Sequence, residues 1–434
     1  MFELIDFRRV PTVRLEDSGR IVDDVDAPDS ERPSPVRLVE FDIDGADPRN
    51  GVLASGGRAW IEVMRSGQVV GVIEREVGPG GLSPGDVADL VLEYRAIEVA
   101  DLAGVSNEGL PMISVVIPTL YHRVDLLERA VRSVAACDYP SFEVIVVDNR
   151  RQDVEPIPHF EGLENVRVEI ERFPGASAAR NRGATLSRGQ IVAFTDDDVE
   201  VDPKWLRALG VAFATDPGLD AVGGMVRPAE LDTEAQLWFE EFFGGFTRNF
   251  APQRWSVALV GDSDPLFPYA AGHFGAGNNM AVRRSVLERA GGFDVRLGAG
   301  TIARGAEDLK VFIDVLLDGG TVAFVPSALV RHSHRRTPRE FREQVFGYGV
   351  GLAALYCALV VADPRHLTRI LRRLPRGLQM FFFPSTPRSL SAEPTYPRST
   401  AWVHALGMAY GPLAYARSAL AVRRTRRRLA VETR

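Results

Sequence analysis

Three short segments in the middle of the chain are almost entirely apolar, at residues 113–117, 144–147 and 190–195. Segments of this length that are apolar throughout are typical of strands buried on both faces of a sheet. Between them, residues 125–134 and 180–186 are helical in character. Because strands alternate with helices, the pattern predicts an α/β fold with a doubly wound, mostly parallel sheet.

Polar residues mark the expected starts of two helices. Asp125 and Glu128 are three residues apart and predict a capping box, in which side chain and backbone cap each other reciprocally. Asp202 is followed by Pro203, and this pair predicts another helix start, since Asp caps helices and Pro fits their first turn.

The N-terminal part, residues 1–105, has a different pattern. It begins with an acidic, proline-containing segment that we expect to be loose. Residues 60–64 and 69–73 then predict a β-hairpin. Ser83, followed by Pro84, predicts the start of a short helix. We therefore expect a small α+β accessory domain before the domain that contains the parallel sheet.

Composition changes this picture little. The chain has 434 residues, longer than one typical domain, with 45% hydrophobic and 25% charged residues, as is ordinary for a globular protein. Its two cysteines, Cys137 and Cys357, provide neither a disulfide framework nor zinc-ligand spacing. The N-terminus is acidic where a signal peptide is basic, and we expect no run of the about 18 to 20 apolar residues that span a membrane. The prediction is a cytoplasmic protein.

Charge is unevenly distributed along the chain. The net charge is -7, yet residues 331–434 carry 19 basic against 5 acidic residues, a balance of +14. The apolar segments 401–410 and 413–422 precede an arginine-rich run at 423–428. We expect a helical basic region over 341–434. It either lies on an anionic membrane surface, as a peripheral membrane element, or packs on the α/β domain with a solvated arginine tail.

Three consecutive carboxylates, Asp196, Asp197 and Asp198, follow the third apolar segment directly. Adjacent carboxylates repel one another unless a cation or hydrogen-bond donors hold them, so the cluster favours a hard divalent metal over a solvated acidic turn. A calcium-binding helix-loop-helix is excluded, because Val201 stands at its required glycine and Arg207 at its closing glutamate.

Thr119 and Asp148 also stand at the ends of predicted strands. In open α/β sheets, ligands bind outside the carboxyl ends of the strands. Together with the aspartate cluster, these residues predict a ligand site at one edge of the sheet.

Seven motifs resemble family 2 glycosyltransferases with the GT-A fold. Four resemble the half that binds the nucleotide sugar: residues 114–119 (SVVIPT), 146–149 (VVDN), 175–183 (GASAARNRG) and 194–198 (FTDDD). Three resemble the acceptor half: residues 277–280 (GNNM), 291–294 (GGFD) and 305–309 (GAEDL). The resemblance covers about residues 111–340 and implies a catalytic domain over 106–340.

On the donor side, the resemblance implies an Asp-x-Asp element made by Asp196 and Asp198. One of the two would lie near the ribose and the other would bind a Mn²⁺ or Mg²⁺ ion. Asp197 could take the place of either. It also implies that Asp148 contacts the nucleobase, with Thr119 beside it. The family usually has a second Asp and small residues after Asp148, whereas this chain has Asn-Arg-Arg, which leaves the nucleotide open.

Arg180 opens a helix, where its guanidinium either reaches the donor's phosphate or base or pairs with a carboxylate at the surface. His332 resembles the additional metal or pyrophosphate ligand of some GT-A enzymes, or is a hydrogen-bonded structural histidine. Positive charge from Arg335 and Arg336 is expected near the diphosphate.

On the acceptor side, the resemblance implies that Asp308 is the general base, with Glu307 orienting the acceptor, although a carboxylate at a helix start also serves as a cap. Asn278 and Asn279 belong to an acceptor-half motif and are expected to bind the acceptor.

The resemblance thus implies an inverting, metal-assisted glycosyltransferase that moves a sugar from a nucleotide-diphosphate donor to a hydroxyl of a glycan or glycolipid, as in cell-envelope polysaccharide synthesis. Polymerising relatives carry a Gln-x-x-Arg-Trp element together with several spanning helices, whereas this chain has Gln-Val-Phe-Gly-Tyr at 344–348 and no expected spanning helix, so we expect a non-processive enzyme. We expect no nucleic-acid partner. The alternatives are a nucleotide-sugar-binding protein without catalysis and a sugar nucleotidyltransferase.

Overall fold

The computed structural model describes residues 14–15, 21–22, 36–45, 57–150, 160, 162–243, 245–247, 250–261, 264–382 and 399–432. The acidic segment expected to be loose lies mostly outside these residues. Within it, β1 (Arg14–Leu15) and β2 (Ile21–Val22) pair antiparallel.

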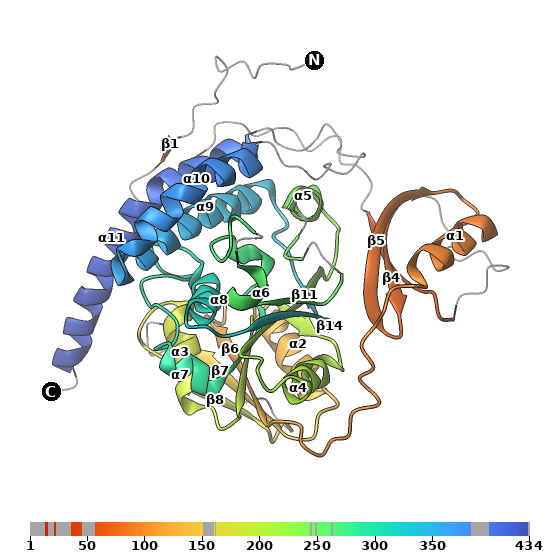
Figure 1. The fold of residues 1–434 in the computed structure, drawn as a ribbon, viewed down its shortest axis with the longest axis horizontal. Helices are drawn as coiled ribbons and strands as arrows, with labels where there is room; N and C mark the ends of the chain where they lie inside the picture. Colours follow the sequence, from red (N-terminus) through yellow and green to blue (C-terminus); the bar gives the residue numbers. More distant parts are fainter. Residues whose placement is uncertain are drawn as a thin grey trace, which may run out of the picture.

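A nine-stranded sheet forms the centre of the molecule (Figure 1). Its strands are β6 (Ile113–Thr119), β7 (Phe142–Asp148), β8 (Val166–Ile170), β9 (Ile191–Thr195), β10 (Val199–Val201), β11 (Ala221–Pro228), β12 (Gln253–Trp255), β13 (Asn279–Arg283) and β14 (Val322–His332). The order across the sheet is β10-β14-β11-β13-β9-β6-β7-β8, and β12 pairs with β14.

Six of these strands run in one direction: β6, β7, β8, β9, β11 and β14. The remaining three, β10, β12 and β13, are antiparallel to their neighbours. The predicted α/β fold with a mostly parallel sheet is confirmed. Alternation of strands and helices did not indicate the three reversed strands.

Helices cover both faces of the sheet. They are α2 (Val124–Ala135), α3 (Ala176–Leu186), α4 (Trp205–Thr215), α5 (Glu234–Phe243), α6 (Val257–Val260), α7 (Arg284–Arg289), α8 (Glu307–Leu317) and a 3₁₀ turn at Ala271–His273. One core contains Val115 and Ile117 of β6 with side chains of α2 and α4. The other contains Val116 with side chains of α3, α7 and α8. Successive β6 residues thus point to opposite faces, which explains the continuous apolar run.

Two predicted helix starts are wrong in detail. Helix α2 already begins at Val124 without a side-chain cap, so Asp125 lies inside the first turn and forms no capping box. Asp202 lies before α4 and closes a turn, accepting hydrogen bonds from Lys204 N (2.8 Å, side chain) and Trp205 N (2.8 Å, backbone). In each case the carboxylate lies near the helix start, but the helix begins at a different residue from the one predicted.

The N-terminal sheet comprises β3 (Arg37–Asp42), β4 (Gly57–Arg65) and β5 (Gln68–Val77), which Figure 1 shows to one side of the central sheet with α1 (Pro84–Tyr94). The predicted hairpin is confirmed, because β4 and β5 pair antiparallel around a two-residue turn. The predicted cap is confirmed as well: Ser83 Oγ accepts a hydrogen bond from Asp86 N, and Asp86 returns the contact to Ser83 N.

Buried charges join this sheet to the central one. Glu62 of β4, which is 0% exposed, accepts hydrogen bonds from Arg227 Nε (2.8 Å) of β11 and Arg331 Nη2 (2.9 Å) of β14. Removing one partner of such a buried pair costs about 3 to 5 kcal/mol. The two sheets are therefore held in a defined relation.

Three long helices close the chain: α9 (Pro338–Ala362), α10 (Arg365–Phe382) and α11 (Thr400–Glu432). Helices α9 and α11 approach closely at glycines, since a Cβ at Gly349 would lie 2.2 Å from the His404 carbonyl oxygen and one at Gly407 would lie 2.3 Å from that of Phe346. The apolar segments 401–410 and 413–422 form one continuous helix with Pro412 inside it.

The expectation that no segment is apolar enough to span a membrane was wrong for α9. Among the described residues, this helix alone has the length and composition of a spanning helix, with a mean hydropathy of 2.0 over its most apolar window. Half of that window is buried inside the protein, as in the core helix of a globular protein.

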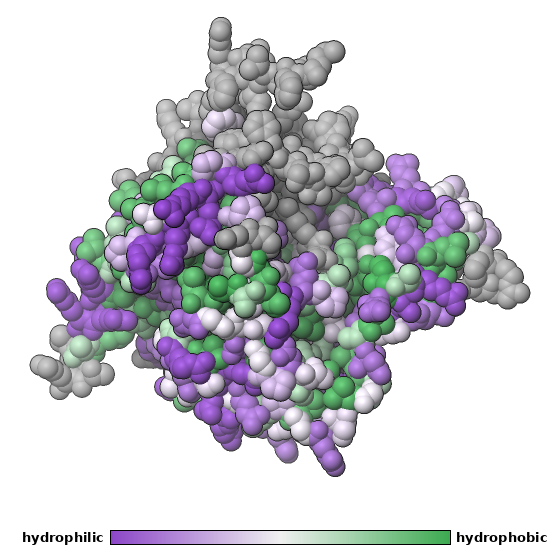
Figure 2. All heavy atoms as spheres, viewed as in Figure 1, coloured by the Kyte–Doolittle hydropathy of each residue, from purple (hydrophilic) through white to green (hydrophobic). Residues whose placement is uncertain are grey.

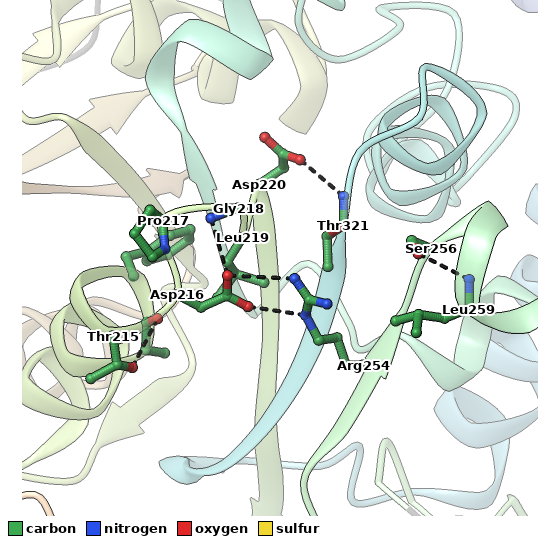
Figure 3. A network of polar contacts seen from close by, with 12 residues as sticks. Thr215, Asp216, Pro217, Gly218, Leu219, Asp220, Arg254, Ser256, Leu259 and Thr321 are labelled. Atoms are coloured by element: carbon green, nitrogen blue, oxygen red, sulfur yellow. Dashed lines mark hydrogen bonds and ion pairs between the residues drawn. The ribbon is translucent and has the colours of Figure 1, made fainter.

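A polar network fixes the edge strand β12 (Figure 3). Asp216, at the end of α4, accepts a hydrogen bond from Arg254 Nε of β12 (3.0 Å), and Asp220 accepts one from Thr321 N (2.9 Å) just before β14. These contacts hold the sheet end opposite the predicted ligand site.

Candidate active site

The carboxyl ends of three neighbouring parallel strands carry the predicted donor-binding residues. Thr119 ends β6 and is the direct cross-strand neighbour of Asp148, which ends β7. Asp196 follows the last residue of β9, which pairs with β6 on its other side. The predicted meeting of these residues at one edge of the sheet therefore agrees with the structure.

The three consecutive aspartates contact three different partners. Asp196 Oδ1 accepts a hydrogen bond from Arg180 Nη2 at 2.8 Å. Asp197 Oδ2 accepts one from Thr119 Oγ1 at 2.6 Å. Asp198 Oδ2 accepts one from Arg123 Nη2 at 2.6 Å. Mutual repulsion is thus relieved by donors that come from separate segments.

Arg180 links the donor side to the acceptor side of the site. This buried arginine of α3 donates to Asp196 and, from its other terminal nitrogen, to Glu307 at the start of α8. Burial and the neighbouring charge of Asp308 raise the pKa of Glu307 to about 7 against the opposing effect of Arg180, with burial the largest cause. Burial likewise raises the pKa of Asp196 to about 6. Arg180 is a buried ion-pair residue, and a surface role is excluded.

Asp308 is held by backbone donors. Its Oδ2 accepts a hydrogen bond from Gly277 N at 2.6 Å, and its Oδ1 accepts one from Leu309 N at 2.8 Å. A Cβ at residue 277 would lie 2.9 Å from Asp308 Cβ and Oδ2, so glycine allows this close approach. The carboxylate is half-buried, unlike the buried Glu307 beside it.

Asp148 has a partner that the motif comparison did not indicate. The Arg150 side chain forms a bidentate contact with it, at 3.0 Å to Oδ1 and 2.9 Å to Oδ2, and stacks 4.6 Å from the centre of the Tyr121 ring. Asn149 accepts a hydrogen bond from Gly175 N at 2.8 Å and so holds the turn before α3. The departure from the family pattern therefore places an arginine against the expected base-binding aspartate.

Of the predicted metal ligands, the structure brings Asp198 and His332 together, with Oδ1 and Nε2 3.4 Å apart. Asp196 turns to Arg180 instead. In the part of the chain that the structure describes, no three His, Cys, Asp or Glu side chains form a group that could hold a metal ion by themselves. Asp198 and His332 fit a divalent ion that takes its remaining ligands from a bound donor and water.

Charge at this pair favours an ionised aspartate and a neutral histidine. Burial would raise the pKa of Asp198, but His332, Arg123 and Arg335 together lower it below its ordinary value. Burial lowers the pKa of His332 to about 4. Metal binding requires this combination, a carboxylate and an unprotonated imidazole nitrogen.

The prediction that Asn279 binds the acceptor is wrong. Its side chain donates hydrogen bonds to the carbonyl oxygens of Met225 and Ala328 (both 2.8 Å) and accepts one from Trp205 Nε1 (2.9 Å), in the core. These contacts use the whole amide. The neighbouring Asn278 is buried too, but its Oδ1 has no hydrogen-bond partner among the described residues.

Of the two arginines expected near the diphosphate, only Arg335 lies near the aspartate cluster. Arg336 pairs with Glu230 and Asp232 away from the aspartates, whereas Arg335 makes no ion pair within the described residues and lies near Asp197 and Asp198. Arg123, which contacts Asp198, was not predicted, because it lies in a loop without any motif.

Parts of the chain are similar to known glycosyltransferases. Residues 114–291 match the family model described as "Glycosyl transferase family 2". The chain is 28% identical over 193 residues, 43% of its length, to a glucosyl-dolichyl phosphate glucuronosyltransferase of Haloferax volcanii, and 37% identical over 123 residues, 27% of its length, to glycosyltransferase AglE of the same organism. These matches span 57% and 40% of the two relatives.

A solved structure of the mannosyltransferase PcManGT from Pyrobaculum calidifontis, in complex with GDP-Man and Mn²⁺, is also similar. It is 19% identical, with a TM-score of 0.44 over 73% of this chain and 90% of that one.

Proposed function

We propose that the protein is a glycosyltransferase of family 2, whose model residues 114–291 match, and that it transfers a sugar from a nucleotide-diphosphate donor to a hydroxyl of a glycan or glycolipid of the cell envelope. The observation that carries the proposal is the Arg180 bridge. It joins Asp196, at the end of a donor-side strand, to Glu307, which adjoins the expected base Asp308. Donor and acceptor groups would thus meet at one site.

Donor binding is assigned to the carboxyl ends of β6, β7 and β9. Asp148 and Thr119 lie side by side there and suit the nucleoside, while Asp196 and Asp197 suit the ribose and diphosphate end. Arg335, which has no ion pair within the described residues, supplies positive charge for the diphosphate.

A divalent ion, Mn²⁺ or Mg²⁺, would be held by Asp198 and His332. When bound, such an ion neutralises the charge that develops on the departing diphosphate. The support is the pairing of an ionised carboxylate with a neutral imidazole, 3.4 Å apart, in a buried position.

Asp308 is the proposed general base. The acceptor oxygen attacks the anomeric carbon, its proton passes to Asp308, and the bond from that carbon to the diphosphate oxygen breaks. Attack from the face opposite the leaving group inverts the anomeric configuration. Glu307, fixed by Arg180, would orient the acceptor, and Asn278 is the remaining candidate for an acceptor contact.

The test is a panel of nucleotide sugars, measured for thermal stabilisation and hydrolysis with Mn²⁺ or Mg²⁺. At least one donor should stabilise the protein only with metal, and Asp198→Asn should lose this effect. Asp138→Asn, an exposed aspartate outside the site, is the matched control and should behave as wild type. Equal stabilisation of wild type and Asp198→Asn would contradict the proposal.

We further propose that the C-terminal region brings the enzyme to the inner face of an anionic membrane. Helix α10 turns Leu367, Leu371 and Leu374 outward, with exposed fractions of 49%, 53% and 45%. Arginines lie on the opposite side of this helix, and Figure 2 shows a strip of hydrophilic residues over α10 with hydrophobic residues beside it. A helix with leucines exposed on one side and arginines on the other suits the boundary between acyl chains and anionic headgroups.

Sedimentation with anionic liposomes tests this proposal. The wild-type protein should pellet with the liposomes, and high salt should reduce binding. Two variants should also bind less: the double variant Leu371→Ser and Leu374→Ser, and a variant in which the arginines of 423–428 are replaced by Gln. Leu92→Ser, which alters a leucine of α1 that is 74% exposed, is the control and should leave binding unchanged. Equal recovery in the supernatant with and without liposomes would reject membrane association.

A further inference from the structure

Arg150 covers the carboxylate to which the nucleoside end of the donor is assigned. Its Nε lies 3.0 Å from Asp148 Oδ1 and its Nη2 lies 2.9 Å from Asp148 Oδ2, so both carboxylate oxygens are occupied. The backbone N–H of Arg150 also donates to Oδ1, at 2.9 Å. The Asp148 side chain is 3% exposed, whereas that of Arg150 is 21% exposed. A ligand that approaches this point therefore meets the guanidinium before it meets the carboxylate.

The Arg150 side chain is held on a second side by an aromatic ring. Its guanidinium carbon lies 4.6 Å from the centre of the Tyr121 ring, a distance at which a cation is attracted to the face of the ring. Tyr121 has a φ of 55°, a left-handed conformation that residues other than glycine rarely adopt. Its N–H donates to Thr119 Oγ1 at 2.9 Å, which fixes this turn. The backbone after β6 therefore places the ring against the guanidinium.

The backbone that carries Arg150 is fixed as well. Asn149 N donates to the carbonyl oxygen of Thr119 at 2.9 Å. The Asn149 side-chain amide donates to the carbonyl oxygens of Glu171 (2.8 Å) and Phe173 (2.7 Å). Arg150 is thus held through its backbone, its carboxylate partner and its aromatic neighbour.

Pairing with Asp148 leaves one end of the guanidinium available. A guanidinium has five N–H donors in one plane, and a bidentate contact through Nε and Nη2 uses two of them. Two parallel N–H bonds remain at the far end of Arg150, one on Nη1 and one on Nη2, and Nη1 has no hydrogen-bond partner within the described residues. Because Asp148 fixes the plane of the guanidinium, this donor fork has a fixed orientation.

A fork of two donors can distinguish nucleobases by their edges. It matches two neighbouring acceptors, which guanine presents as N7 and O6 and cytosine as N3 and O2. Uracil has a hydrogen on N3 between its two carbonyl oxygens, and adenine has an amino group beside N7, so each would place a hydrogen against the fork. A bidentate arginine contact of this kind discriminates between bases by about 10- to 100-fold.

We propose that Arg150 is a specificity-determining residue of the donor site and selects a nucleoside diphosphate whose base has two neighbouring acceptors, guanine or cytosine, against uracil and adenine. This inference rests on the proposed function, which assigns the nucleoside to Thr119 and Asp148. Asp148 then acts through Arg150, as the group that orients the guanidinium, and does not itself contact the base.

The first test compares four nucleoside diphosphates on the unaltered protein. Isothermal titration calorimetry with Mn²⁺ measures the affinity for GDP, CDP, UDP and ADP, which share the ribose and the diphosphate and differ in the base. GDP or CDP should bind about 10- to 100-fold more tightly than UDP and ADP, and the tighter of the two identifies the base. If UDP or ADP bound as tightly as the better of GDP and CDP, the proposal would be overturned.

The second test removes the fork with and without the charge. Arg150→Lys keeps a positive charge beside Asp148, but an ammonium group has no planar fork. Arg150→Ala removes both and opens the Asp148 carboxylate to the N3 hydrogen of uracil. In both variants the preference for GDP or CDP over UDP should fall about 10- to 100-fold, and Arg150→Ala should bind UDP more tightly than wild type does. A preference that stayed at the wild-type value in both variants would show that the fork does not contact the base.

Arg284→Ala is the matched control. The Arg284 side chain of α7 is 42% exposed, and its N–H donates to the carbonyl oxygen of Gln190 just before β9, at the end of the sheet opposite the donor site. This variant should keep all four affinities. Preference is a ratio of two affinities measured on the same protein, so a general loss of folded protein or of diphosphate binding does not change it.

Failure of this inference differs from failure of the proposed function. If none of the four nucleoside diphosphates binds, the proposed function is contradicted and the inference falls with it. If they bind without the described preference, only the role of Arg150 is contradicted. If the preference is as described but no sugar is transferred, the role of Arg150 stands and the proposed catalysis is contradicted.

Discussion

Replacing Arg180 by methionine should destabilise the protein strongly at alkaline pH and only weakly at acidic pH. The substitution keeps a long apolar side chain but removes the positive charge between Asp196 and Glu307. Arg180 is 4% exposed and Glu307 is 7% exposed in their side chains, so solvent does not replace the lost partner. Breaking a buried ion pair in this way costs about 3 to 5 kcal/mol.

The pH dependence follows from the raised pKa of Glu307. With a folded value of about 7 and an ordinary value of 4.5, this group favours folding below about 4.5, and that contribution is lost as pH rises through 7. The difference corresponds to about 3 kcal/mol already in the wild type. At pH 5 Glu307 is protonated with or without Arg180, so the variant then loses mainly hydrogen bonds, about 1 to 2 kcal/mol.

Urea unfolding at pH 5 and pH 8, followed by the fluorescence of the five tryptophans, measures both values. Arg182→Met is the matched control on the same helix, because Arg182 is 41% exposed and lies 3.5 Å from Glu169, so its loss should stay below about 0.5 kcal/mol. If Arg180→Met lowered the free energy of unfolding equally at the two pH values, the stabilisation by Arg180 would not depend on the buried negative charge of Glu307, and the reasoning would be refuted.

Two further predictions concern the C-terminal helices and the mode of synthesis. Gly349→Val should destabilise the protein by about 1 to 3 kcal/mol, because its Cβ would lie 2.2 Å from the His404 carbonyl oxygen. Gly347→Ala is the control and should be nearly neutral in the same urea assay, because its Cβ would have only Arg304 side-chain atoms nearby, at 3.8 Å. With one donor and a purified acceptor, mass spectrometry should find products longer by a single sugar; a ladder of long polymers would show that the enzyme is processive.

Local sequence patterns predicted three parallel strands of the central sheet, β6, β7 and β9, and the residues at their carboxyl ends. Apolar runs closed by Thr119, Asp148 and Asp196 sufficed to bring these residues to one edge, because parallel strands share their carboxyl end. The cap at Ser83 was predictable because it depends on a local contact: its partner Asp86 is only three residues away.

Long-range pairing was beyond the sequence. His334 and Glu240 are 94 residues apart, and Arg180 and Glu307 are 127 apart, so their contacts depend on how separate helices pack. Asn279 misled for the same reason: its motif lies beside the site, but the strand pleat turns its amide into the core. Helix α9 could have been recognised as a candidate span from its composition, since residues 345–362 carry no charge, but composition alone does not separate a core helix from a membrane helix.

The central claim is that Asp308 is the general base of sugar transfer. The most direct test compares how fast wild type and Asp308→Asn release nucleoside diphosphate from a donor that stabilises the protein, in the presence of Mn²⁺ and acceptor. Asp308 is half-buried and hydrogen-bonded to Gly277 N and Leu309 N, contacts that an asparagine oxygen keeps in part, so the fold and donor binding should remain. The account predicts that wild type releases the diphosphate. Asp308→Asn should bind the donor equally well, but it should release diphosphate only at the background rate. Release by Asp308→Asn at the wild-type rate would contradict it.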